Sequence, residues 1–121
     1  PYTQAFRNQK VVKKSQKFGL DAVKQRVTCK SVDDACRKII NDSGYGKYFI
    51  HSTGHGIGLD VHELPTISTR STTKLQNKMA ITVEPGIYIP NKFGVRIEDS
   101  LIVKDSKPIL LHKFTKELVT L

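Results

Sequence analysis

The chain has 121 residues, enough for one compact domain. Its content of 38% hydrophobic and 26% charged residues is typical of a soluble globular protein, and no apolar run approaches the ~20 residues that a membrane helix needs. The chain start lacks the basic, apolar and small-residue pattern of a secretory signal. Cys29 and Cys36 form no CxxC pair, so we expect two reduced thiols in a cytoplasmic protein without membrane partners.

The net charge of +9 raises anionic partners as a function class. Much of this charge lies in the first quarter of the chain, at Arg7, Lys10, Lys13, Lys14, Lys17, Lys24 and Arg26. No aromatic residues alternate with these cations to form a stacking platform, and no known nucleic-acid-binding motif is present. A solvated helix face is therefore favoured, and nucleic-acid binding is the less favoured alternative.

Two helices are predicted in the first third of the chain. Residues 3–18 place apolar side chains among polar ones in the pattern of an amphipathic helix, and Gly19 is predicted to end it. A short helical turn follows within 20–27. Residues 32–42 repeat apolar side chains at helical spacing, with Ser31 as the expected N-cap and a stop signal at Asn41-Asp42-Ser43-Gly44.

The remainder of the chain favours strands. Ile57, Leu59 and Val61 alternate with polar residues or glycine, which indicates a half-buried strand, and residues 66–78 have the composition of a surface loop. Four further strands are expected at 80–83, 87–89, 95–103 and 109–111, with turns at 90–94 and 104–108. The prediction is an α+β domain in which two helices precede an antiparallel, curved sheet.

The stretch His51–Glu63 contains three histidines and three glycines in thirteen residues. Glycine costs about 1 kcal/mol inside a helix and packs poorly in a strand, but it permits sharp bends and close approach. Histidine is the commonest metal ligand and titrates near neutral pH. A glycine-rich loop with incidental histidines is the alternative, but three histidines packed this way favour a functional site.

Strand parity sets a condition on that site. In an unbroken strand, His62 lies on the polar face and His55 has the opposite parity. Both side chains reach one site only if the chain turns or bulges near Gly56.

Glu84 and Glu98 face each other if their segments pair as a hairpin that turns near Asn91. Facing residues have β-carbons ~5 Å apart, and like charges placed there are destabilising. Three explanations fit: the carboxyls share a proton, Arg96 on the same face neutralises them, or they bind a cation. A slipped register, with both carboxylates facing water, is the fourth.

Two further features bear on a cation. Pro85 removes a ladder donor, which indicates an edge or bulge beside Glu84. Histidine with carboxylates suits a catalytic divalent ion such as Mn, Co, Fe or Zn, and the absence of nearby cysteine ligands argues against a structural zinc site.

Three segments in this order and spacing resemble the pita-bread metallopeptidases: residues 51–65, 83–88 and 94–99. The similarity is greatest to Xaa-Pro dipeptidases (prolidases) and aminopeptidases P, and it spans essentially the whole chain. It implies half of a pita-bread fold and an exopeptidase that hydrolyses the bond before proline in a peptide. The choice between dipeptidase and aminopeptidase stays open.

The resemblance also implies roles for individual residues. His55, Glu84 and Glu98 would be metal ligands of two divalent ions, Mn or Co first and Zn or Fe next, with a bridging hydroxide as nucleophile. Glu84 would also shuttle a proton, and His62 would stabilise the oxyanion and contact substrate. His51 would shape the substrate pocket. Arg96 would orient the ligating carboxylates beside the substrate.

The chain departs from the family pattern at its start. Family members use two further aspartate ligands on strands before the first helix, and this sequence begins at that helix. Residues 1–121 are therefore expected to be the C-terminal part of the catalytic domain, binding one metal ion or none and nearly inactive alone. An exposed sheet edge predicts self-association. A non-catalytic peptide- or protein-binding module of the same fold is the alternative function.

Overall fold

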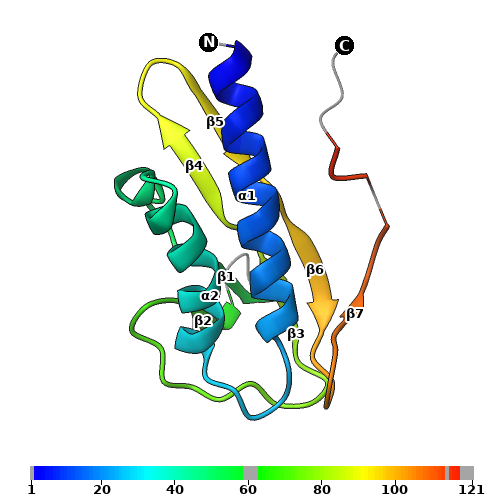
Figure 1. Ribbon diagram of the computed structural model, residues 1–121. Coiled ribbons are helices and arrows are strands. Elements are labelled where there is room, and N and C mark those ends of the chain that lie inside the picture. Colours follow the sequence, from blue (N-terminus) through cyan, green and yellow to red (C-terminus); the bar gives the residue numbers. More distant parts are fainter. Residues whose placement is uncertain (1, 59–62, 114, 118–121) are drawn as a thin grey trace.

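The structure, a computed structural model, describes residues 2–58, 63–113 and 115–117. Two helices, α1 (Tyr2–Ala22) and α2 (Cys29–Asp42), lie side by side, and the short 3-10 helix η1 (Gly46–Tyr48) follows them (Figure 1). The strands are β1 (Gly54–Gly56), β2 (Glu63–Ile67), β3 (Ala80–Val83), β4 (Gly86–Ile89), β5 (Phe93–Arg96), β6 (Asp99–Ile102) and β7 (Ile109–Leu110). Neither helix in the described part of the chain is long and apolar enough to cross a bilayer.

Helix α1 is longer than the spacing of its apolar residues indicates. It continues through Gly19 to Ala22, so the predicted stop at Gly19 and the separate turn after it are wrong. A β-carbon at position 19 would overlap the Cys36 sulfur and lie 3.1 Å from Val83 Cγ1. Gly19 is therefore the point where α1 approaches α2 and the sheet closely, rather than a helix terminator.

Helix α2 begins three residues earlier than the expected N-cap allows. Thr28 is the N-cap, in extended conformation, and its hydroxyl accepts a hydrogen bond of 3.2 Å from the Ser31 backbone N–H. Ser31, the predicted cap, lies in the first turn, and its own hydroxyl donates to the Thr28 carbonyl. The predicted end is confirmed: the helix stops at Asp42 and Gly44 takes a φ of +87°.

The strands form a five-stranded antiparallel sheet in the order β2-β1-β3-β6-β7 and a separate two-stranded ribbon, β4-β5. This arrangement confirms two helices followed by an antiparallel sheet. The expected single strand over 95–103 is wrong, because it breaks at Ile97-Glu98 into β5 and β6. Of the strand expected around Ile57, Leu59 and Val61, Ile57 lies just after β1, which ends at Gly56, and residues 59–62 lie outside the described part.

The core lies between the helices and the five-stranded sheet. Its fully buried apolar side chains come from both layers and include Val12, Val32, Cys36, Ile40, Ile67, Ile81, Val83 and Leu101. Both cysteines are buried and free, which agrees with the expectation of reduced thiols. The β4-β5 ribbon runs beside the first half of α1, and the fully buried Ile87 of β4 belongs to the same core (Figure 1).

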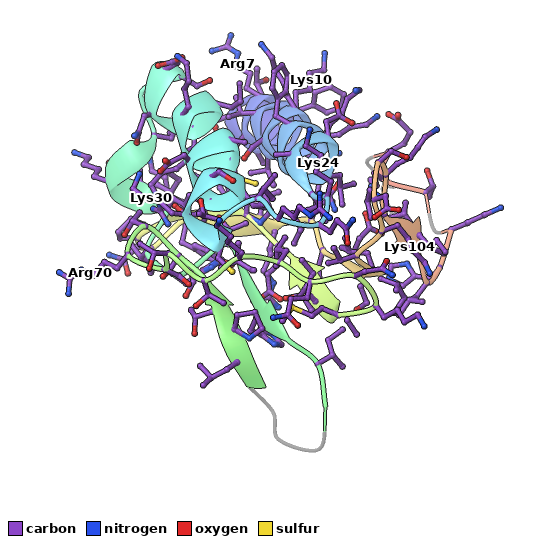
Figure 2. All side chains as sticks on the ribbon, turned by 90° about the horizontal axis from the view of Figure 1, so that it is seen from below. Arg7, Lys10, Lys24, Lys30, Arg70 and Lys104 are labelled. Carbon is purple, nitrogen blue, oxygen red and sulfur yellow. The ribbon has the colours of Figure 1, made fainter. Side chains whose placement is uncertain are left out.

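The basic side chains lie on the outside of both layers. Figure 2 shows Arg7 and Lys10 on α1, Lys24 after it, Lys30 on α2, and Arg70 and Lys104 on loops, spread around the rim of the molecule. Three lysines pair with an acidic residue four positions later on the same helix: Lys17, Lys30 and Lys38. The excess charge is thus distributed over several surfaces.

Candidate active site

Glu84 and Glu98 face each other at the break between the two sheets. The β3-β6 ladder ends at the pair Val83 and Asp99, and the β4-β5 ladder starts at Gly86 and Arg96. The next position after the Val83–Asp99 pair, toward the hairpin turn, places Glu84 opposite Glu98, and the Gly86–Arg96 pair gives the same register. The predicted register is therefore confirmed, and the slipped register is excluded. Pro85, beside Glu84, lies in the gap where neither ladder continues.

The two carboxyl groups interact strongly enough to change the proton affinity of Glu98. The pKa of Glu98 is raised, first by partial burial, then by the negative charge of Glu84 and by a hydrogen bond between the two carboxyls. Arg96, whose Nε is 3.9 Å from Glu98 Oε1, and His55 lower it. Arg96 is itself half-exposed, so it compensates the facing charges only in part.

His55 is brought to Glu84 by an irregularity in β1. The β1-β2 register shifts between His55 and Gly56, where a turn or bulge was expected if His55 and His62 share one site. The strand is also anchored on β3, because the Thr82 hydroxyl accepts a hydrogen bond of 3.1 Å from the His55 backbone N–H. As a result, His55 Nε2 lies 3.5 Å from Glu84 Oε2.

The hydrogen bonds of His55 assign its tautomer. Nδ1 is 2.8 Å from the Gly56 carbonyl oxygen, which can only accept, so Nδ1 carries the hydrogen. In the neutral ring the lone pair then lies on Nε2, the nitrogen that is 3.5 Å from Glu84 Oε2. A backbone carbonyl that holds Nδ1–H in this way is the usual partner of a histidine that binds metal through Nε2.

The donor set at this point fits a divalent cation in its chemistry. Glu84 Oε2 is buried and accepts no hydrogen bond from the described residues, although an unsatisfied carboxylate oxygen is costly. An imidazole lone pair and two facing carboxylates suit Mn, Co, Fe or Zn. Among the described residues, however, no three His, Cys, Asp or Glu side chains form a ready-made metal-binding group.

His51 and Arg96 line the same pocket as His55 and Glu84. This pocket has a volume of about 320 Å³ and also includes Thr66. The structure therefore brings together five of the six predicted site residues: His51, His55 and Glu84 around the pocket, Arg96 at its rim, and Glu98 opposite Glu84. The sixth, His62, lies outside the described residues.

Tyr88 belongs to this site and was not predicted from the sequence. Its hydroxyl is 2.9 Å from His51 Nε2, and His51 Nδ1 is 2.7 Å from the Ser52 carbonyl oxygen. A β-carbon at Gly86 or Gly94 would meet the Tyr88 ring at less than 3 Å, so these glycines make room for it. The alternation of positions 84, 86 and 88 on one face of the strand was a signal that could have identified Tyr88.

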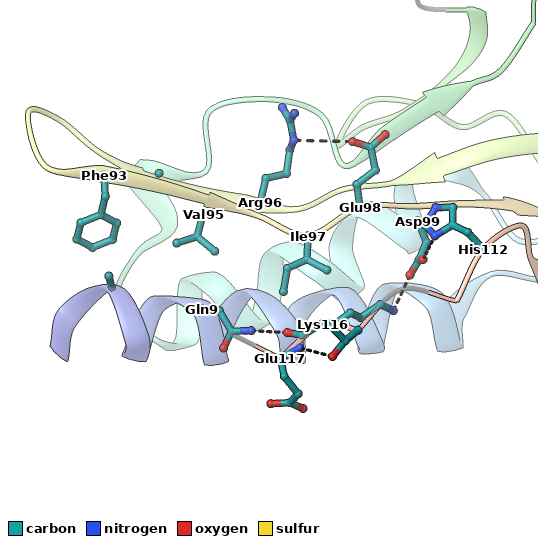
Figure 3. A pocket seen from close by; sticks show the side chains of 13 residues that line it. Gln9, Phe93, Val95, Arg96, Ile97, Glu98, Asp99, His112, Lys116 and Glu117 are labelled. Carbon is teal, nitrogen blue, oxygen red and sulfur yellow. Dashed lines mark hydrogen bonds and ion pairs between the residues drawn. The ribbon is translucent and has the colours of Figure 1, made fainter. Parts of the chain in front are cut away.

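A second, larger pocket of about 560 Å³ lies between α1, β5 and the C-terminal segment, with Glu98 and Asp99 at one end (Figure 3). Asp99 is nearly fully buried, and its Oδ2 is 2.5 Å from Lys116 Nζ and 2.7 Å from Gln16 Nε2. Figure 3 shows Arg96 and Glu98 on the opposite side of the strand from Val95 and Ile97, which point toward α1. The pocket thus lies behind the segment that carries Glu98 between β5 and β6, and His55 does not line it.

Comparison with known proteins supplies the family. The profile of metallopeptidase family M24 matches residues 2–105. An Xaa-Pro dipeptidase of Pyrococcus furiosus is 47% identical over 109 residues, which are 90% of this chain and 31% of that protein. A putative Xaa-Pro aminopeptidase of Mycoplasma pneumoniae is also 47% identical, over 84% of this chain and 29% of its own length. The chain therefore spans less than a third of the length of these curated relatives.

Solved structures agree with these sequence relatives. The Xaa-Pro dipeptidase from Bacillus anthracis superimposes with a TM-score of 0.95 at 45% identity, covering 98% of this chain and 33% of its own. A recombinant prolidase from Thermococcus sibiricus gives a TM-score of 0.95 at 44% identity, covering 100% and 33%. The expected pita-bread fold is thus confirmed for this part of the structure. In sequence and in fold, the chain belongs to metallopeptidase family M24.

Proposed function

We propose that the protein acts as a metal-dependent exopeptidase that hydrolyses the peptide bond before proline, as a cytoplasmic Xaa-Pro dipeptidase or Xaa-Pro aminopeptidase. The observation that carries this proposal is the convergence of His55, Glu84 and Glu98 across the break between two sheets. The names of the relatives support the substrate class.

His55, Glu84 and Glu98 would hold the metal. Divalent cations bound there would lower the pKa of water and polarise the scissile carbonyl. Mn or Co is proposed first, and Zn or Fe next, because imidazole with carboxylates accepts all four. The buried Oε2 of Glu84 and the Nε2 lone pair of His55 supply the donors, and the facing charges of the two glutamates supply the electrostatic attraction.

The other site residues would act on protons and on substrate. Glu84 would carry a proton from the attacking water to the leaving imino nitrogen. His51, held by Tyr88, would shape the pocket that receives the peptide, and Arg96 would keep Glu98 oriented beside it. His62 is proposed to hydrogen-bond the substrate carbonyl and stabilise its developing charge.

These 121 residues are proposed to be the C-terminal part of the catalytic domain. The share of the relatives that they span supports this. We expect two metal ions in the intact protein and one or none in these residues alone, which would be nearly inactive. Two Asp ligands from the rest of the domain would complete the site.

The isolated chain is also proposed to self-associate. Leu64 on β2 is 84% exposed and Ile50 is 72% exposed, and β2 is the outer strand of the five-stranded sheet. An uncovered edge with large apolar side chains favours pairing with a second copy. Light scattering on the isolated chain should show a dimer, and a stable monomer at high concentration contradicts this.

A non-catalytic peptide- or protein-binding module of the same fold is the second candidate. Such a module has no use for an imidazole and two facing carboxylates at one point. All three are present here, so the enzyme is favoured.

The test uses the full-length protein that contains these residues. Purified protein is incubated with Leu-Pro or with Leu-Pro-Ala, with added Mn²⁺ or with chelator, and free leucine is measured. Hydrolysis that chelator removes and Mn²⁺ restores supports the peptidase, and preference for one peptide separates dipeptidase from aminopeptidase. Glu84→Gln should abolish it, whereas Asp105→Asn, which removes an exposed carboxylate on a loop, should leave it unchanged. Wild-type protein that binds both peptides but hydrolyses neither contradicts the peptidase and supports the binding module.

A further inference from the structure

The segment from Phe49 to Thr53 connects η1 to β1 and carries His51 into the pocket. It is not part of a strand, because β1, the first strand in the described part of the chain, begins at Gly54. Ile50 in its middle is largely exposed, so packing does not hold the segment there. Phe49 at its start is buried, and the Thr53 N–H at its end donates to the Ile67 carbonyl of β2 at 2.8 Å. Further contacts to this segment come from α2.

Arg37 of α2 binds this segment at two alternate residues. Its Nη1 donates to the Phe49 carbonyl at 3.0 Å, and its Nη2 donates to the His51 carbonyl at 3.0 Å. The guanidinium also lies over the Phe49 ring, 4.0 Å from its centroid, and the Phe49 ring meets the His51 ring edge-on at 5.2 Å. Arg37 therefore contacts both the backbone of His51 and the aromatic ring that packs against its imidazole.

Asp33, one helical turn earlier, holds Arg37 and extends the contact to Thr53. Its side chain is fully buried and pairs in a fork with Arg37, at 2.9 Å to Nε and 3.1 Å to Nη2. Its Oδ1 also accepts a hydrogen bond of 2.8 Å from the buried Thr53 hydroxyl. The Thr53 carbonyl in turn accepts the Glu84 backbone N–H at 2.6 Å.

We propose that Asp33 and Arg37 are positioning residues for this site: together they set where His51 stands in the pocket and, through Thr53, where Glu84 enters it. This inference rests on the proposed function, since it concerns the same pocket. Neither side chain lines the pocket that His51, His55 and Glu84 share, so both act through the segment that they bind.

The geometry favours positioning over simple helix stabilisation. An i,i+4 ion pair on a helix surface is worth only a few tenths of a kcal/mol, and α2 carries two such exposed pairs, Lys30 with Asp34 and Lys38 with Asp42. Asp33 and Arg37 have the same spacing but are withdrawn from water. Burying a charge pair is costly unless every remaining donor is satisfied. Here two of the three guanidinium N–H groups that Asp33 leaves over donate to carbonyls of the site segment.

The experiment compares Arg37→Lys with wild type in the full-length protein. Lysine keeps the charge beside Asp33 but cannot hold the fork and two carbonyls at once. We expect KM for Leu-Pro, or for the peptide that wild type cleaves, to rise at least tenfold, with kcat changed less than threefold. A purely structural role would lower the fraction of active molecules, which reduces kcat and leaves KM unchanged, and that result overturns the proposal.

Nuclear magnetic resonance of histidine-labelled, metal-free protein provides the readout independent of activity. In Arg37→Lys, the ring nitrogen signals of His51, identified by their loss in His51→Gln, should shift, while those of His112 stay in place. Unchanged His51 signals overturn the proposal. If wild type cleaves no Xaa-Pro peptide, the proposed function fails, yet this spectrum still decides the positioning role.

Two further variants complete the design. Thr53→Val is isosteric and removes the hydrogen bond to Asp33, together with a side-chain contact to the Cys36 thiol. It serves if Arg37→Lys does not fold; KM should rise two- to fivefold, and an unchanged KM contradicts the proposal. Lys30→Met breaks the exposed pair on the same helix and should leave KM, kcat and the His51 signals within error of wild type. A tenfold rise of KM in Lys30→Met would show that any change in α2 has this effect, and would also overturn the proposal.

Discussion

Glu84 and Glu98 stand opposite each other because the ladders on either side of them share one register. The β3-β6 pairing and the β4-β5 pairing continue into each other across the gap, with no residue inserted on either strand. The break interrupts the ladders and leaves one long backbone hydrogen bond, from the Ile97 N–H to the Pro85 carbonyl at 3.4 Å, while the side chains stay face to face. Two acidic groups held together in this way are unfavourable without a cation.

Glu84→Gln should stabilise the metal-free protein and weaken its affinity for divalent ions. The change removes one of two facing negative charges, which is worth about 0.2–1 kcal/mol, and supplies an amide donor to Glu98. Urea unfolding in the presence of chelator measures the first effect, and calorimetric titration with Mn²⁺ measures the second. Asp105→Asn is the matched control and should change neither. A destabilised Glu84→Gln protein would contradict the repulsion between the two carboxylates.

The stability of the metal-free protein should fall as pH rises through the titration of Glu98. Its pKa is raised above the ordinary 4.5 in the folded state, by burial first and by Glu84 next. Between the ordinary and the raised pKa the folded state binds more protons than the unfolded state, so the free energy of unfolding decreases with pH. Urea unfolding from pH 4 upward, with chelator, should show a smaller decrease for Glu98→Gln than for wild type. Parallel profiles would contradict the shift.

The Cys36 thiol should not react with iodoacetamide in the native protein. Burial raises the pKa of this thiol to about 12, with the Asp33 charge as a smaller cause in the same direction. At pH 8 only about one molecule in 10,000 would carry the reactive thiolate, and the group is also inaccessible. Mass spectrometry should find Cys36 unmodified in buffer and fully alkylated in urea. Rapid native labelling would show that α1 and α2 separate readily.

Gly54→Ala should destabilise the protein and disturb its metal affinity together. A β-carbon at position 54 would overlap the Thr82 carbonyl oxygen, which is backbone and cannot swing aside. Overpacking of this kind costs about 1–3 kcal/mol, and β1, which carries His55, would have to move. Gly44→Ala is the control: its φ of +87° costs an alanine about 1–2 kcal/mol, but no heavy atom lies within 4 Å of the added carbon. Urea unfolding should detect both changes, whereas Mn²⁺ titration should detect Gly54→Ala alone.

Patterns local in the sequence predicted much of the fold. The turn at Asn91 was expected from composition, and Asn91 indeed takes a φ of 61°. The end of α2 and the limits of β3 also agree with the prediction. The failures involve contacts between distant segments: Gly19 resembles a helix stop, yet it serves the approach of α1 to Cys36, which lies on the other helix.

In the candidate site, too, local patterns were predictable from the sequence, whereas contacts between distant segments were not. The sequence by itself determined which residue types were available and which face of a strand each occupies, since side-chain direction follows from the two-residue period. It thereby placed Glu84 opposite Glu98 if their segments pair as a hairpin, and made a turn or bulge near Gly56 the condition for His55 and His62 to share a site. The roles of His51, His55, His62, Glu84, Arg96 and Glu98 in binding and catalysis stay predictions.

Only the tertiary structure decided which groups hold these residues in place. Arg37 donates a hydrogen bond to the His51 carbonyl, and the Tyr88 hydroxyl is hydrogen-bonded to the His51 ring. These residues are far apart in the sequence, and the sequence does not indicate that they lie close together in the fold. Periodicity determines direction within one element, whereas the distance between two elements depends on how their side chains pack. That is why the sequence identified a family and a set of donors, and the folded chain was needed to show what positions them.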